Sequence, residues 1–131
     1  MSELPINKEK YDEFVEFIEQ DSWKLATIEQ WTKDVRLAGL DPIEGLGELA
    51  LQEIIQRMAD WISELRNDPV AFSNFNYRVD IPIRFDQNTL SDEDWATIHL
   101  FRCFQKVWLR NEFSVRSAKD ATDSDRKHLK P

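Results

Sequence analysis

Cysteine is nearly absent from this chain of 131 residues, which contains only Cys103. A single cysteine excludes an intramolecular disulfide bond and is typical of proteins in a reducing compartment. No run of about 18 apolar residues occurs, so we expect no membrane-spanning helix and no membrane partner. The N-terminal residues also lack the apolar run behind a basic start that marks a secretory signal. We therefore predict a cytoplasmic protein.

Histidine is scarce as well, and residue sets that bind metals or activate nucleophiles are missing. His99 and Cys103 lie four residues apart, a spacing that suits two ligands of one metal ion. There is no second cysteine, however, and the only other histidine is His128 near the C-terminal end. The Gly-x-Ser-x-Gly motif of hydrolase nucleophiles does not occur. We assign no catalytic residue, no cofactor and no metal ligand, and expect a buried Cys103 and a surface His99.

One glycine-containing segment matches the letters of a dinucleotide-binding motif. Residues 45–50 read GLGELA. That chemistry needs a preceding strand, whose turn presents backbone N–H groups to a pyrophosphate. Here the residues before the segment are those of a helix cap. We therefore interpret Gly47 as a residue on an apolar face that lets another helix pack closely.

Charge is plentiful and unevenly distributed. The chain has 25 acidic and 17 basic residues, a net charge of −8. Residues 1–70 hold 16 acidic and 7 basic residues, a balance of −9, whereas residues 71–131 hold 9 and 10, a balance of +1. The first half would repel the phosphate backbone, so we expect no direct binding to nucleic acid.

Apolar residues recur at the three-and-four spacing of a helix face in four segments. The clearest pattern is that of Ile54, Ile55, Met58, Trp61, Ile62 and Leu65. The predicted helices cover residues 8–20, 27–38, 41–66 and 92–111, and a longer second helix would start at Ser22. The sequence therefore predicts a mainly α fold, a small bundle of about four helices. We expect residues 1–116 to form a single domain and residues 117–131 a flexible polar tail.

Turn and cap residues set these boundaries. Gly39 suits the left-handed position that ends a helix. Asp41 with Pro42 predicts the start of the third helix, because aspartate caps helices and proline favours their first position. The run from Asn67 to Pro69 predicts its end near residue 66.

A short β element is predicted at residues 77–85, between the third and fourth helices. Tyr77, Val79, Ile81, Ile83 and Phe85 alternate with more polar residues, the period of a half-buried strand. Pro82 favours an edge position, because it cannot donate to a ladder. A lone strand needs a partner, and three remain open: residues 113–116, a second copy of the chain in a homodimer, or an incoming peptide.

The first predicted helix carries the most specific surface feature. Its outer face holds the carboxylates of Glu9, Asp12, Glu13, Glu16 and Glu19. Such a run is either an ordinary solvated face or a docking surface for a basic partner. Phe17 and Trp23 lie off the apolar stripes of their helices. They belong to a partner-binding patch if exposed, and to a second packing layer if covered.

These patterns favour a non-catalytic protein-interaction domain, such as an accessory subunit, an inhibitor or an immunity-type protein. Its partner would be a protein with a basic surface patch. The predicted partner-binding residues are Asp12, Glu13, Glu16, Glu19, Phe17 and Trp23. Two alternatives remain: a small enzyme or ligand-binding bundle with an internal pocket lined by tryptophans, and a nucleic-acid mimic that blocks a DNA-binding protein.

Overall fold

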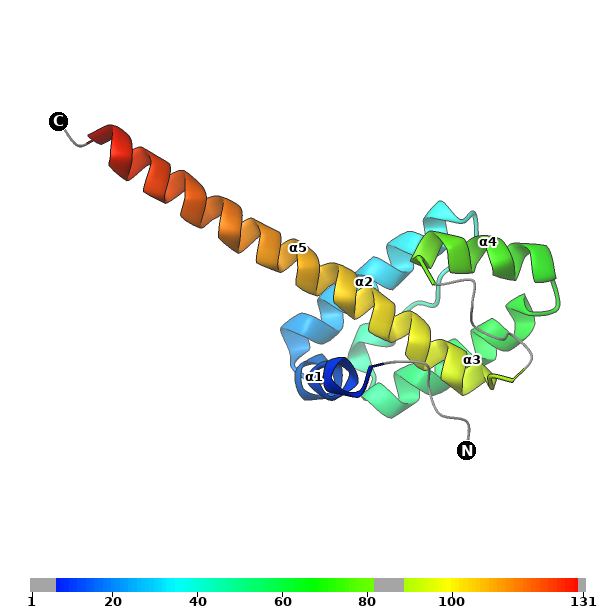
Figure 1. The fold of residues 1–131 in the computed structure, drawn as a ribbon. Helices are drawn as coiled ribbons and strands as arrows, with labels where there is room; N and C mark the ends of the chain where they lie inside the picture. The colour runs from blue at the N-terminus through cyan, green and yellow to red at the C-terminus, as the bar shows by residue number, and fades with distance from the viewer. Residues whose placement is uncertain (1–6, 82–88, 130–131) are drawn as a thin grey trace.

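Five α-helices form the molecule in the computed structural model, which describes the backbone of residues 7–81 and 89–129 and the side chains of residues 7–81, 89–112 and 114. The helices are α1 (Lys8–Ile18), α2 (Asp21–Leu37), α3 (Leu51–Leu65), α4 (Pro69–Val79) and α5 (Asp92–Leu129), with a 3-10 turn η1 (Leu46–Glu48). The first part of α5 lies among the other helices, and its C-terminal part projects away from them (Figure 1). The predicted mainly α bundle is confirmed.

Aromatic rings from every α-helix build the core around α5. The ring of Phe14 in α1 lies 5.6 Å from that of Phe101 and 5.3 Å from that of Phe104. Elsewhere in the core, the rings of Trp31 in α2 and Trp61 in α3 are 5.0 Å apart.

No helix in the described part of the chain has the length and hydropathy needed to cross a membrane.

The first two helices follow their local signals. The Asn7 side chain accepts a hydrogen bond from the Lys10 N–H and caps α1. Gly39 follows α2 with a φ of +78°, the left-handed conformation predicted for it. The start of α2 at Asp21 corresponds to the longer of the two predicted versions.

The predicted start of the third helix at Asp41 and Pro42 is wrong, because α3 begins at Leu51. Residues 41–50 instead form a loop that contains η1. Gly45 turns the loop with a φ of +79°, and the Asp41 carbonyl accepts a hydrogen bond from the Trp61 indole at 2.9 Å. The close approach predicted for Gly47 is present, since a Cβ there would lie 2.7 Å from Leu25 Cδ2. At Gly47 the loop thus lies against the Leu25 side chain of α2.

The predicted strand at residues 77–85 is also wrong where the structure describes it, because α4 continues to Val79. Asp68 caps this helix by accepting a hydrogen bond from the Ala71 N–H at 3.1 Å, and Pro69 occupies its first turn. Its buried side chains fall at helical spacing: Phe72, Phe75, Asn76 and Val79. The same segment therefore carries a helical period that overrides the alternation. Residues 82–85 lie outside the described part.

The consequences extend to the strand's predicted partners. Residues 113–116 belong to α5 and are helical, so they do not form a pairing strand. Edge pairing in a homodimer needs a strand that residues 77–81 do not supply. The backbone of α5 continues beyond the predicted end at Asn111 to Leu129. The division into a domain of residues 1–116 and a tail of residues 117–131 stays a prediction.

Candidate functional site

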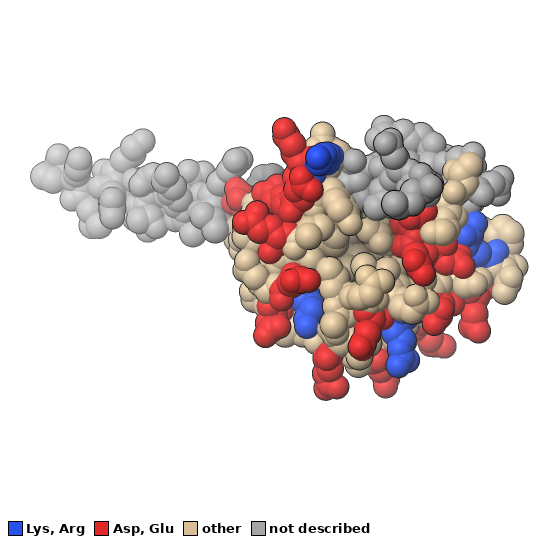
Figure 2. Space-filling view, turned by 90° about the horizontal axis from the view of Figure 1, so that it is seen from below, with Lys and Arg blue, Asp and Glu red and all other residues tan. Residues whose placement is uncertain are grey.

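The outer side of α1 is an acidic face, formed by Glu9, Asp12, Glu13, Glu16 and Glu19. All five side chains are exposed. None of them takes part in an ion pair with any residue that the structure describes. The side of the molecule on which α1 and α3 lie carries many acidic and few basic side chains (Figure 2). The structure therefore brings the four predicted carboxylates together on one exposed helix.

Phe17 and Trp23 belong to an aromatic cluster between α1, α2 and α5, whose members are Phe17, Trp23, Phe104 and Trp108. The indoles of Trp23 and Trp108 stack with their centroids 5.2 Å apart, and the ring of Phe17 lies 5.3 Å from that of Trp108. Phe17 and Trp23 are only half-buried. Both side chains therefore pack against the core as a second layer and remain partly accessible to solvent.

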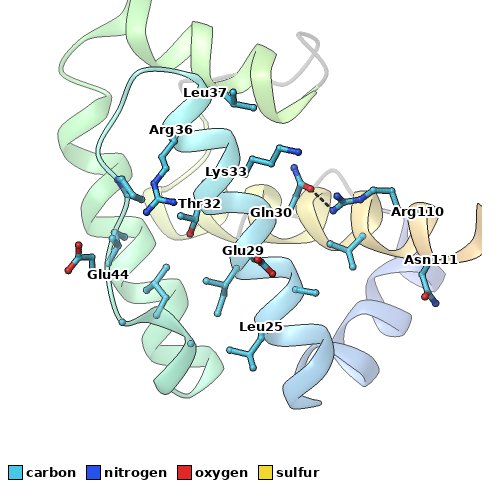
Figure 3. Close-up of a pocket in the computed structure, with 18 of the residues that line it drawn as sticks. Leu25, Glu29, Gln30, Thr32, Lys33, Arg36, Leu37, Glu44, Arg110 and Asn111 are labelled. Carbon is cyan, nitrogen blue, oxygen red and sulfur yellow. Dashed lines mark hydrogen bonds between the residues drawn. The ribbon is translucent and has the colours of Figure 1, made fainter. Parts of the chain in front are cut away.

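Sequence reasoning missed a groove along α2, which we call the α2 groove. It has a volume of about 1140 Å³ and lies between α2, the 42–47 loop and about two turns of α5, from Val107 to Ser114. Its walls are shown in Figure 3 and include these residues from the three segments: Leu25, Ile28, Glu29, Lys33, Arg36, Leu37, Ile43, Glu44, Val107 and Arg110. No local sequence pattern predicts this groove, because one of its walls is the 42–47 loop and would be absent if those residues were helical.

A buried polar chain fixes α5 against α2 beside this groove. The Asp34 carboxylate is only 3% exposed. It accepts hydrogen bonds from Lys106 Nζ at 3.0 Å and from Gln30 Nε2 at 3.1 Å. Gln30 in turn accepts a hydrogen bond from the Arg110 guanidinium, which lines the groove (Figure 3). A fixed path of polar contacts thus connects the buried carboxylate to the groove wall.

Cys103 is buried, as predicted, and lies 3.8 Å from Asp34. Burial, together with the neighbouring Asp34 charge, raises the pKa of the Cys103 thiol far above its usual value. The thiol therefore stays protonated at neutral pH. A protonated, inaccessible thiol is a poor nucleophile and a poor metal ligand.

His99 lies in the core, so its predicted surface position is wrong. Its Nε2 is 2.7 Å from Asn76 Oδ1, and its ring lies 5.1 Å from that of Phe75 and 6.0 Å from that of Trp95. The unexpected helix α4 provides Asn76 and Phe75 and covers this side of α5. Burial lowers the pKa of His99 to about 3, so the imidazole is neutral at physiological pH.

His99 and Cys103 do not share a site, because each contacts different polar partners. Within residues 7–81 and 89–112, no three His, Cys, Asp or Glu side chains gather closely enough to hold a metal ion. The buried indoles of Trp31 and Trp95 pack against other rings, at 5.0 Å from Trp61 and 5.1 Å from Phe72.

No known protein family, curated protein or solved structure matches this chain.

Proposed function

We propose that this chain is a non-catalytic protein-interaction domain that binds the basic surface of a partner protein through the acidic face of α1. The observation that supports this proposal best is the set of exposed carboxylates on α1, all without an ion pair among the described residues. Carboxylates left without a counter-charge produce a field that attracts a basic partner and speeds its approach.

The way α1 is anchored supports the same proposal. Phe14 and Ile18 are buried on its inner side, and Phe14 packs edge-on against two rings of α5. The carboxylates therefore project from a helix that the core holds in place. A preorganised charged surface loses little conformational entropy when a partner binds. Phe17 and Trp23, which are partly accessible, would add apolar contact area.

The test begins with affinity capture from the native cell, followed by mass spectrometry. A stoichiometric protein partner is expected, and its association rate is then measured by stopped flow or surface plasmon resonance at two salt concentrations. Recovery of no stoichiometric partner contradicts the proposal. A partner that binds DNA, and that DNA displaces from this chain, would favour the nucleic-acid mimic instead.

Charge reversal then locates the surface. The triple variant Glu13→Lys, Glu16→Lys and Glu19→Lys is expected to slow association about tenfold and to reduce its salt dependence. The matched control is the triple variant of three exposed α3 residues, Glu53→Lys, Asp60→Lys and Glu64→Lys, which changes the net charge equally. An equal loss in both triple variants would assign the effect to net charge or to the whole acidic side that α1 and α3 share, and would remove the specific role of α1 from the proposal.

A further inference from the structure

We propose that the α2 groove is a second docking site, and that its occupant is an acidic amphipathic helix from a partner protein. This inference goes beyond the proposed function, because it concerns a different surface with the opposite charge preference. It rests on the groove's length, its exposed apolar residues and its unpaired cations.

The dimensions suit a short helix. The groove extends along α2 from Leu25 to Leu37. At a rise of 1.5 Å per residue, this stretch is about 18 Å long, which corresponds to about three helical turns. The 42–47 loop forms one wall, and Val107 and Arg110 of α5 contribute to another. A helix-in-groove complex of this size is held by apolar anchors spaced at i, i+3, i+4 and i+7.

The groove offers apolar surface for such anchors. Leu25 and Leu37, near its two ends, keep 51% and 54% of their surface exposed. Ile28 and Ile43 line it between them and are half-buried. Exposed aliphatic side chains rimmed by polar residues are typical of protein-binding surfaces.

Three cations line the groove in an otherwise acidic protein. Lys33, Arg36 and Arg110 are exposed, and none of them forms an ion pair with the residues that the structure describes. Lys33 and Arg36 lie three residues apart, on neighbouring positions of one face of α2, and Figure 3 shows their side chains diverging from it. Gln30 holds Arg110 in place. Carboxylates beside the apolar stripe of a bound helix would meet these cations. Glu29 and Glu44 also line the groove, so one basic residue on the ligand would complete the match.

A second copy of the chain fits the groove poorly. The most acidic helix that it could supply is α1, whose apolar side chains Phe14 and Ile18 are already buried in its own core. Only Val15 remains as an exposed aliphatic residue on α1. The combination of apolar anchors and flanking carboxylates is therefore one that α1 of a second copy does not offer, and a helix from a different protein fits the groove better.

The experiment is fluorescence anisotropy at physiological salt with a labelled synthetic peptide of about 14 residues. The peptide has leucines at i, i+3, i+4 and i+7, glutamates on both flanks and one lysine. We expect saturable binding with a Kd below about 100 µM. A peptide with lysines in place of the glutamates should bind at least about tenfold more weakly. Absence of saturable binding at about 1 mM, or equal binding of the two peptides, overturns the proposal.

Variants assign the binding to the groove. Lys33→Glu with Arg36→Glu is expected to raise the Kd of the acidic peptide at least about tenfold. The control pair Lys8→Glu and Lys10→Glu on α1 changes the net charge equally and should alter the Kd less than about twofold, because neither residue lines the groove and salt screens exposed charges that do not touch the ligand. Leu25→Ser with Leu37→Ser should also weaken binding, and the α1 triple lysine variant should not. An unchanged Kd in the Lys33 and Arg36 variant overturns the proposal.

Sedimentation of the chain alone distinguishes the other occupant. A dimer that forms with rising concentration, and that Lys33→Glu with Arg36→Glu abolishes, would identify a second copy in the groove and overturn the partner-helix proposal. A monomer supports it. The α1 experiment follows a different partner and a different surface, so the failure of one proposal leaves the other intact.

Discussion

Toward α1, helix α5 presents Phe101 and Phe104, whose rings lie around the ring of Phe14. Toward α2, it presents Lys106, whose ammonium group lies 3.0 Å from the buried Asp34 carboxylate. The side toward α4 combines ring packing, with Phe72 at 5.1 Å from Trp95, with polar contacts. There His99 is 2.7 Å from Asn76 Oδ1, and Arg102 bonds to Asp80 at 2.6 Å.

The two sides of α5 differ in what they specify. The stabilisation from ring packing is roughly proportional to the apolar area buried, and it changes little with small shifts of the helix. Such packing therefore holds α1 in place without dictating a single register. A buried charge or imidazole is costly unless one particular partner is present, so the polar side selects one alignment of α5 against α2 and α4. The polar contacts toward α2 and α4 therefore add register and pH dependence to the stability that ring packing contributes.

The largest expected effect concerns the aromatic side. Phe14→Ala should lower the free energy of unfolding by about 3–5 kcal/mol, because it leaves a cavity beside two rings of α5. The measurement is urea denaturation followed by circular dichroism. Val15→Ala is the matched control on the same helix, since Val15 is 44% exposed and its truncation should change stability by less than about 0.5 kcal/mol. Equal losses in both variants would contradict the assignment of α1 to the core.

Removal of Lys106 tests the polar side. Lys106→Met should lower the free energy of unfolding by about 2–3 kcal/mol, because it leaves the Asp34 carboxylate buried without a counter-charge. This is less than for a fully buried pair, since the Lys106 side chain remains 20% exposed. Lys33→Met, which removes a cation without an ion pair among the described residues, is the control and should have little effect. A loss as small as in this control would show that Asp34 does not depend on the ion pair.

The pH dependence of stability is the third way to separate the two sides. In the unfolded chain His99 titrates near 6.5, whereas burial lowers its pKa to about 3 in the fold. Below pH 6.5 His99 therefore binds a proton in the unfolded state but not in the native state. The free energy of unfolding is thus highest above pH 6.5 and decreases as the pH falls below that value.

The substitution His99→Gln removes this titration and keeps a polar group beside Asn76. Between pH 7 and pH 5 the unmodified protein should lose about 2 kcal/mol more than the variant. Urea denaturation at both pH values measures the difference. Identical pH dependence in the two proteins would place His99 in contact with solvent.

Local sequence signals predicted much of the fold. The apolar spacing placed α1 and α5 on the chain, and Gly39 marked the end of α2 correctly. The helix α4 was missed because the residues Asp68 and Pro69 were interpreted only as the end of the preceding helix, although the same pair caps the next one. Without α4, the burial of His99 could not be predicted either, because α4 is the helix that covers it.

The candidate surfaces were predictable to different degrees. The acidic face of α1 followed from helical spacing alone, because side chains opposite a buried stripe must face solvent. The α2 groove could not be predicted in this way. It depends on residues 41–50 remaining a loop, and Asp41 and Pro42 carry a helix-start signal that the Trp61 indole and the left-handed Gly45 override.

The sequence by itself determined the helical class and the acidic face of α1, since each depends on residues within a few helical turns of one another, and the burial of Cys103 followed from the general preference of cysteine for the interior. Only the tertiary structure decided the burial of His99, the pairing of Asp34 with Lys106 and the existence of the α2 groove. Asp34 and Lys106 are 72 positions apart along the chain. Contacts of that kind depend on how helices dock, and docking depends on the summed packing of the whole core rather than on any local period.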